Sequence, residues 1–408
     1  MELNVNNENI IEKSKLLGIN FDLMDSYYCL FENYHDFFNR EERINIVDNF
    51  LSADKHEPRK EYAIELIKNH WKVHSKDPFY TYLNALDKIE PAIQIYKENH
   101  RDHVVHTAYV FLLGLHLFKL NKDIRKAIKN YFCKNKLESY SSQSLNGREV
   151  FDGFFVENYS GKNVPSDDLE LFRFMWLIIS TFHDLSYSFE SFIHQMASYI
   201  HHINDLGKDQ PNYVPTSIEL PFNKMEVLSI GNSFELLNNL QKDYDNQGNY
   251  LDLEKYLKDR LNEGFVDHGI VSALLLLKTS DILYIKNPHW KKEFFDKTFP
   301  HIALSIALHN IDWKFAKKKY DKLPEITLEN FPLCYLLILA DTLQEWDRPS
   351  KVKYRRMIDS TGVSIEFNQE EKKFIVKFAL SKERINDVRK ELKDKLSSKD
   401  IPIINKMK

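Results

Sequence analysis

Histidine and aspartate residues stand in five otherwise apolar segments of this chain. They are His106 in HVVHTAYVFLLG, the adjacent pair His183 and Asp184 in MWLIISTFHDLSY, His268 in DHGIVSALLLL, His309 in IALSIALHNID and Asp341 in LCYLLILADTLQEWDR. A buried histidine or aspartate is costly unless it is paired or bound to a metal. Imidazole nitrogens together with carboxylate oxygens suit Mn, Fe, Co, Ni or Zn. Six ligands exceed the need of one tetrahedral ion, so the pattern predicts two divalent transition-metal ions.

A His-Asp dipeptide alone is weak support for such a site. The chain contains a second one, His35 and Asp36 in FENYHDFFNREE, with no apolar helix around it. We expect that pair to be ordinary surface residues. The prediction depends instead on the order His, His-Asp, His, His, Asp, with each member on its own apolar segment.

This order resembles the HD-domain superfamily of metal-dependent phosphohydrolases, over roughly residues 100–350. His106 begins a His-Thr-x-x-Val segment, a usual form of the first motif helix, and His183 with Asp184 matches the signature pair. His268 and His309 match the extra ligands of the binuclear branch, which includes cyclic-dinucleotide phosphodiesterases. Asp341 matches the closing aspartate. The chain lacks the GYP signature of the cyclic-di-GMP enzymes and the lysine that often follows the signature pair.

The resemblance implies a mechanism as well as a ligand set. Asp184 would bridge the two ions, with His106, His183 and Asp341 on one and His268 and His309 on the other. A hydroxide bridging the metals would attack phosphorus in line. The leaving oxygen needs a proton. Tyr187, one turn after His183, is a candidate catalytic donor, and a packing aromatic is the other interpretation of this residue.

Several further residues are candidates for ligand or substrate contacts. His103 competes with His106 for the role of first ligand. His194 could point with His201 toward the site and bind substrate, or lie on a helix surface. Arg348 could grip a phosphate with its planar fork, or form an ion pair with a nearby carboxylate. His116, His289 and His301 are expected to be structural.

The composition restricts the class of protein. The 408 residues suffice for two or three domains. With 56 Lys+Arg against 60 Asp+Glu, the net charge of −4 argues against a broad nucleic-acid-binding surface and a polybasic membrane anchor. The three cysteines show no paired spacing, and we find neither a secretory signal nor an apolar run long enough for a membrane span. We therefore expect a cytoplasmic protein.

The hydrophobic pattern predicts a mainly α fold. Long apolar segments at 104–120, 169–186, 266–283, 302–310 and 332–346 are typical of buried helices in one bundle. Polar stretches at 121–168 and 203–262 indicate loops with short helices. In the tail, alternating residues at 362–368 and 373–379 predict a β-hairpin and 381–396 a charged helix.

These elements divide the chain into an N-terminal helical region at 1–95, an HD-type bundle at 96–355 and a C-terminal hairpin with helix at 356–408. In the first region we expect helices at 21–28, 31–38, 61–73 and 80–96, with turns at Glu57-Pro58 and Asp77-Pro78. The tail should pack on the bundle or on a second subunit, since a lone hairpin is marginal in water.

The leading hypothesis is a phosphohydrolase that cleaves a phosphodiester in a nucleotide or a cyclic or oligonucleotide substrate. A deoxynucleotide triphosphohydrolase is an alternative, which would use His106, His183, Asp184 and Asp341 for one metal and leave His268 and His309 for substrate. A non-catalytic nucleotide sensor stabilised by metal is another. A scaffold whose histidines only hydrogen-bond in the core is the remaining possibility. A homodimer is an open possibility.

Overall fold

The computed structural model describes residues 23–27, 30, 40–53, 56–71, 87–88, 102–137, 167–187, 190, 204–205, 208, 226–227, 231–245, 248–286, 292–344, 363–368, 370–378 and 382–406. Helices make up 74% of these described residues, and one small three-stranded sheet lies near the C-terminus. The expected mainly α class is confirmed.

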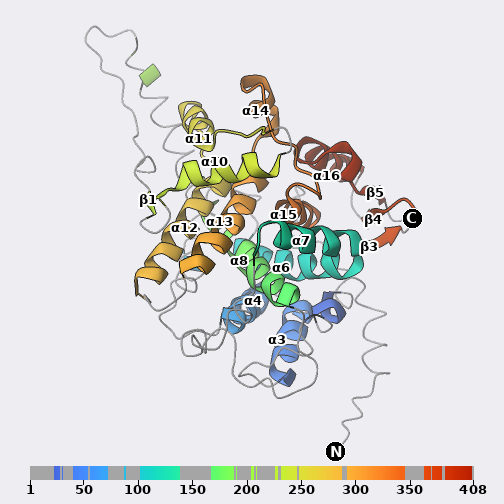
Figure 1. The fold of residues 1–408 in the computed structure, drawn as a ribbon. Helices are drawn as coiled ribbons and strands as arrows, with labels where there is room; N and C mark the ends of the chain where they lie inside the picture. Colours follow the sequence, from blue (N-terminus) through green and yellow to red (C-terminus); the bar gives the residue numbers. More distant parts are fainter. Residues whose placement is uncertain are drawn as a thin grey trace, which may run out of the picture.

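Most of the described chain lies in twelve α-helices (Figure 1). They are α3 (Arg40–Ser52), α4 (His56–Trp71), α6 (His103–Leu120), α7 (Lys122–Lys134), α8 (Asp167–Phe182), α10 (Ser233–Tyr244), α11 (Leu253–Asn262), α12 (His268–Lys286), α13 (Lys292–His309), α14 (Trp313–Lys319), α15 (Pro332–Leu343) and α16 (Lys382–Lys395). The strands are β1 (Glu226–Val227), β2 (Gly231–Asn232), β3 (Val363–Asn368), β4 (Lys373–Phe378) and β5 (Ile403–Lys406).

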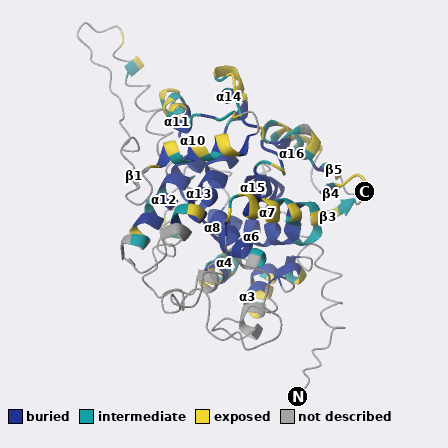
Figure 2. Ribbon diagram, viewed as in Figure 1, coloured by how far each residue is buried: buried dark blue, intermediate teal, exposed yellow. Residues whose placement is uncertain are grey.

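Helices α6, α8, α13 and α15 form the centre of the molecule and are coloured mostly as buried (Figure 2). Every residue of α6 from His103 to Phe118 is buried, which explains why its sequence is apolar on all sides. Among the described residues, α6 alone is long and apolar enough to cross a membrane, but 89% of it is covered by the rest of the protein. It therefore has the surroundings of a core helix.

A glycine brings α6 and α8 close together. A Cβ added at Gly114 would lie 1.9 Å from Cζ2 of Trp176, so the indole occupies the space that a side chain would need. The Trp176 indole N–H donates to the Phe111 carbonyl at 2.9 Å. This contact fixes the relative position of the two helices whose ends carry the first predicted ligands.

Polar caps determine where α6 begins and ends. Asp102 accepts hydrogen bonds from the backbone N–H groups of Val104 and Val105 at 2.9 and 3.0 Å, so the helix begins at His103. Asn121 ends α6 and also caps α7 through Asp123 N–H at 2.7 Å. His103 and His106 thus lie in the first turn of a rigid buried helix.

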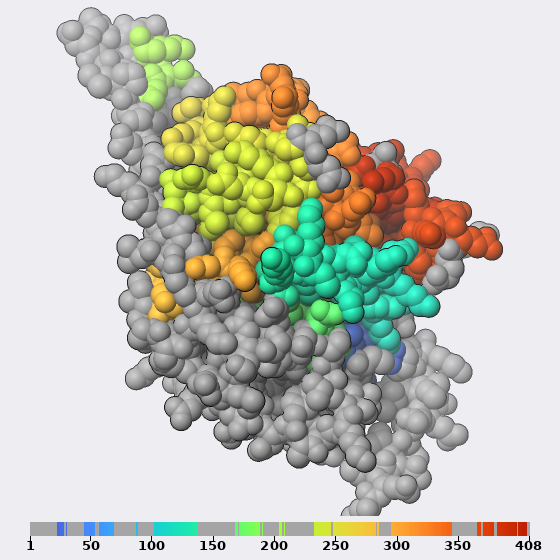
Figure 3. Space-filling view, viewed as in Figure 1, coloured from blue at the N-terminus to red at the C-terminus, as the bar shows by residue number. Residues whose placement is uncertain are grey.

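Amphipathic helices cover this centre. Among the residues coloured in Figure 3, α7, α10 and α11 cover much of the visible face, with the C-terminal elements beside them. Helix α7 lies within the polar stretch 121–168, and α10 and α11 lie within 203–262, where we expect short helices.

Several helix boundaries differ from expectation, and α3 was not expected. Helix α8 ends at Phe182, so His183 and Asp184 lie in a turn. Helix α13 begins at Lys292, ten residues early, and contains Pro300, because packing on both sides outweighs one lost hydrogen bond. Pro58 is not a turn residue but lies in the first turn of α4, where its missing N–H costs nothing. The expected helices at 31–38 and 80–96 lie wholly or mostly outside the described residues.

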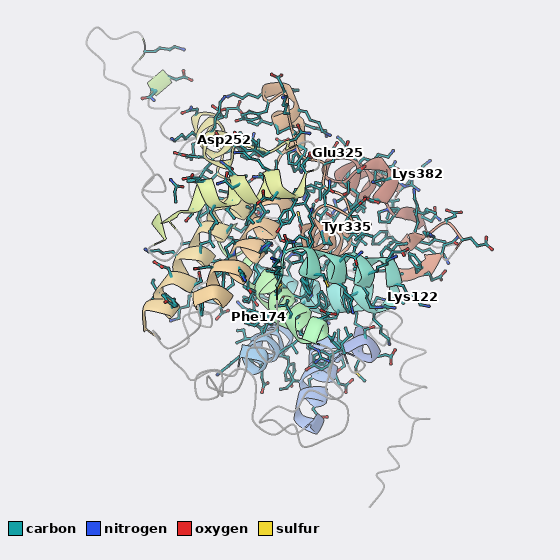
Figure 4. The ribbon with its side chains drawn as sticks, viewed as in Figure 1. Lys122, Phe174, Asp252, Glu325, Tyr335 and Lys382 are labelled. Atoms are coloured by element: carbon teal, nitrogen blue, oxygen red, sulfur yellow. The ribbon has the colours of Figure 1, made fainter. Side chains whose placement is uncertain are left out.

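The predicted hairpin is present as β3 and β4, with Ile365 opposite Val376. Strand β5, which the sequence analysis missed, pairs with β4 in parallel. The tail packs on the helical core: Tyr335 of α15, labelled in Figure 4, donates its hydroxyl to the Asp400 carbonyl at 2.7 Å. Buried side chains of α3, α4 and the tail belong to one apolar cluster with the central helices.

Candidate metal centre

The ends of five central elements bring the six predicted ligands together. His106 lies in the first turn of α6, and His183 and Asp184 follow α8. His268 begins α12, His309 ends α13, and Asp341 lies in the last turn of α15. All six are buried. Their ligand atoms form two groups, each within 4.8 Å: His106, His183, Asp184 and Asp341 in one, and Asp184, His268 and His309 in the other.

The turn after α8 is fixed to α12 by hydroxyl groups. Ser186 donates its Oγ to the His268 carbonyl at 2.6 Å, and its backbone N–H donates to the Ser272 Oγ at 3.0 Å. These bonds join the segment that carries Asp184 to the first turn of the helix that carries His268. The separation between the two ligands is therefore set by bonds to the backbone.

The two carboxylate oxygens of Asp184 face different histidines. Oδ2 lies 3.4 Å from His106 Nε2 and 3.5 Å from His183 Nε2. Oδ1 lies 3.1 Å from His268 Nε2 and 3.9 Å from His309 Nε2. Asp341 Oδ1 lies 3.1 Å from His106 Nε2, on the Oδ2 side. Asp184 therefore stands between two sets of ligands.

The outer nitrogen of each histidine faces an oxygen atom. His183 Nδ1 lies 2.8 Å from the Ser180 carbonyl, and His309 Nδ1 lies 2.6 Å from the Ile306 carbonyl. A carbonyl oxygen only accepts, so in both rings the proton is on Nδ1. His106 Nδ1 lies 2.6 Å from Gln344 Oε1, and His268 Nδ1 pairs with the Glu190 carboxylate. In their neutral form all four imidazoles direct an Nε2 lone pair toward Asp184.

This arrangement fits a cation better than a network of hydrogen bonds. The Nε2 atoms of His106 and His183 lie 3.2 Å apart, with the Nδ1 proton of each ring directed elsewhere. Two facing lone pairs repel unless a proton or metal lies between them. Among the described residues, the buried Nε2 of His309 has no hydrogen-bond partner. Nitrogen and carboxylate donors in this combination suit first-row transition metals.

Charge and burial act differently on the two histidines near Oδ1. Burial lowers the pKa of His309 to about 3, so its ring is neutral at pH 7 and has a free lone pair. Burial also opposes the charged form of His268, but the carboxylates of Glu190 and Asp184 outweigh this effect and raise its pKa well above the usual value. The negative field at His268 also favours a metal cation.

A second glycine allows α12 and α13 to approach each other beside the site. A Cβ at Gly269 would lie 2.8 Å from the Ile306 carbonyl and 3.1 Å from His309 Nδ1. The first of these distances is too short for a real contact. Glycine at this position therefore lets the two helix ends place His268 and His309 next to one another.

The other predicted residues have different positions. Tyr187 lies between two histidines: its ring centre is 4.1 Å from that of His103 and 5.5 Å from that of His268. His103 is buried and its Nε2 lies 3.9 Å from Asp184 Oδ2, but it is not in either ligand group. His106 is thus the better first ligand. Arg348 and His194 lie outside the described residues.

Three contact residues were missed from the sequence. Gln344 lies three residues after Asp341, so that α15 and its C-cap contact both ring nitrogens of His106. Glu190 and Asn310 both lie at His268 Nδ1, Asn310 at 3.1 Å. Gln344 and Asn310 are close in sequence to a predicted ligand, which was the available clue. Glu190 is 78 residues from His268, and nothing local indicates the pairing.

Two histidines expected to be structural bond to hydroxyl groups away from this centre. His116 Nδ1 lies 2.9 Å from Ser26 Oγ, and His301 Nδ1 lies 2.9 Å from the Tyr131 hydroxyl. The remaining one, His289, is outside the described residues.

Comparisons with known proteins give no relative for this chain. No protein-family model, curated protein or solved structure matches it.

Proposed function

We propose that this protein is a metal-dependent phosphohydrolase that cleaves a phosphodiester bond in a nucleotide or a cyclic or oligonucleotide substrate. The observation that carries the proposal is the convergence of four Nε2 atoms and the Asp341 carboxylate on the two oxygens of Asp184. The same six residues, in this order along the chain, support the resemblance to the HD-domain superfamily.

The two oxygens of Asp184 favour two ions rather than one. On the Oδ2 side His106, His183 and Asp341 would hold an ion, and on the Oδ1 side His268 and His309 would hold another. When bound, two such divalent ions supply a strong nucleophile from water at neutral pH and neutralise charge that develops on a phosphate. Mn, Fe, Co, Ni and Zn all suit these donors.

The residues around the ligands have defined tasks in this proposal. Asp184 holds the two halves of the centre at a constant separation, because Ser186 ties its turn to α12. Tyr187 is the candidate donor of a proton to the leaving oxygen, since its partly exposed ring lies between His103 and His268. His103 lies against Tyr187 with the two rings tilted by 31°, and its Nε2 is 3.9 Å from Asp184 Oδ2, so it helps to orient the Tyr187 ring.

The first test combines metal analysis with an activity screen. Purified wild-type protein should contain about two transition-metal ions per chain, and Mn²⁺-loaded protein should hydrolyse linear or cyclic dinucleotides. The panel also includes deoxynucleoside triphosphates. About one ion with release of triphosphate would support the triphosphohydrolase alternative. Tight nucleotide binding without turnover would support the sensor. No bound metal after reconstitution with Mn²⁺ or Fe²⁺ would contradict every metal-dependent version.

A further inference from the structure

The outer partners of the four histidines are not equivalent. Three of the Nδ1 atoms face neutral oxygens, namely the Gln344 amide, the Ser180 carbonyl and the Ile306 carbonyl. Among the described residues, the outer nitrogen of His268 alone faces a carboxylate, that of Glu190. A carboxylate paired with the outer N–H of a ligand histidine orients the ring and increases its basicity toward a metal. The two halves of the centre therefore differ in their surroundings.

The backbone of Glu190 is bonded to the same residue that bonds to His268. The backbone N–H of Glu190 donates to the Ser186 carbonyl at 3.1 Å, and the Ser186 hydroxyl donates to the His268 carbonyl at 2.6 Å. The Glu190 side chain is 27% exposed, so it is partly removed from water. These bonds place Glu190 and His268 on one small framework.

The charges of the two halves also differ. The Oδ2 side has its own carboxylate, Asp341, next to His106. Within the part of the chain that the structure describes, the Oδ1 group contains no second carboxylate ligand besides the shared Asp184. A divalent cation there would be neutralised less completely unless charge reaches it through a ligand. Glu190 lies where it can supply that charge through the His268 ring.

We propose that Glu190 is the positioning residue that makes the His268 and His309 half of the centre competent to bind its metal ion. The inference rests on the proposed metal centre. Glu190 acts through His268: it keeps the proton on Nδ1, directs Nε2 toward Asp184 Oδ1 and adds negative charge to the half that lacks its own carboxylate ligand.

Asn310 separates the contribution of charge from that of orientation. Its side-chain Nδ2 lies 3.1 Å from His268 Nδ1. A flip of the amide would place Oδ1 there instead, where it would serve as a neutral acceptor for the Nδ1 proton. Loss of Glu190 would then leave the orientation of His268 partly intact and remove the charge. We therefore expect the metal affinity, rather than the fold, to change.

The test is a calorimetric titration of metal-free full-length protein with Zn²⁺. In Glu190→Gln we expect the weaker of two binding steps to lose about 10–100-fold in affinity, with the tighter step unchanged. Glu190→Ala should show at least the same loss.

Glu263→Gln is the matched control, because Glu263 is exposed and pairs with Arg260 away from the site. This variant should bind both ions as the wild type does. Gln344→Glu places a carboxylate beside His106 instead, and the affinity of the weaker binding step should then stay unchanged.

Two outcomes overturn the inference in distinguishable ways. If the wild type binds two ions and Glu190→Gln binds both with wild-type affinity, Glu190 has no such role and the metal centre stands. If the wild type binds no Zn²⁺, the proposed function fails together with the inference. Circular dichroism of each variant shows whether the helical fold is retained.

Discussion

Helix α13 carries two buried histidines that differ in what surrounds them. His301 and His309 are 5% and 0% exposed, and burial lowers the pKa of each to about 3. His301 contacts the hydroxyl groups of Tyr131 and Tyr244. His309 instead directs Nε2 toward Asp184 Oδ1, 3.9 Å away, and this atom has no hydrogen-bond partner among the described residues.

The comparison shows which feature separates a structural histidine from a candidate ligand. Residue type, helix and burial are the same for both. Burial raises the pKa of the Tyr131 and Tyr244 hydroxyls, so both stay protonated and can donate in the His301 cluster. A buried polar nitrogen left without such a donor is unfavourable. His309 is therefore a candidate metal ligand, whereas hydrogen bonds account for the environment of His301.

The largest expected effect comes from the residue that joins the two halves of the centre. Asp184→Asn should lose both metal ions, because the shared carboxylate faces every histidine of the site. Metal content by elemental analysis measures this loss. Asp281→Asn is the control, since Asp281 is fully buried on α12 but pairs with Lys278. Retention of two ions in Asp184→Asn would contradict the bridging arrangement.

Leucine substitutions at the two histidines of α13 test the comparison directly. His309→Leu should lose the ion of the Oδ1 side, while the metal-free protein loses only the Nδ1 hydrogen bond to the Ile306 carbonyl, because Nε2 has no hydrogen-bond partner among the described residues. His301→Leu should retain the metal and lower the free energy of unfolding by about 1–3 kcal/mol, because Tyr131 and Tyr244 lose the Nδ1 atom that both hydroxyls contact. Metal analysis and urea denaturation measure the two effects. If both variants changed in metal content and in free energy of unfolding to the same extent, the two histidines would not differ in role.

The pH dependence of stability sharpens the comparison at His301. Its pKa is about 3 in the folded protein against 6.5 ordinarily, so between these values the unfolded chain binds the extra proton. The contribution of neutral His301 is complete above pH 6.5 and is lost as the pH falls, by up to about 1.4 kcal/mol per pH unit. Denaturation of EDTA-treated wild type and His301→Leu should show this slope as a difference, since His309 contributes equally to both. If the free energies of unfolding of the two proteins changed in parallel with pH, this expectation for His301 would be wrong.

The smallest expected effect concerns the spacing of α12 and α13. Gly269→Ala would place its Cβ 2.8 Å from the Ile306 carbonyl and 3.1 Å from His309 Nδ1, so the helix ends must separate slightly. We expect a loss of metal affinity on the Oδ1 side that is smaller than the 10–100-fold typical of lost outer partners. Calorimetric Zn²⁺ titration measures it. An unchanged affinity would show that the close approach is not needed for the ligand geometry.

The amino-acid sequence by itself determined the helical class, the buried helices and the six candidate ligands, Asp184 among them. Apolar segments of helical length must be buried, and charged or ligating side chains within them require a common partner. The hairpin could also be predicted from the sequence, because apolar and polar residues alternate there with the period of two that is typical of a β-strand.

Only the tertiary structure decided how these residues face each other. The rotation of α6 makes His106 rather than His103 a member of the ligand group. The outer partners depend on contacts between distant segments: Gln344 is 238 residues from His106, and Glu190 is 78 residues from His268. Strand β5 was missed because four residues that pair in parallel depend on β4 for their structure. Sequence periodicity reports burial along one helix, whereas the direction of each Nε2 depends on how five helix ends pack together.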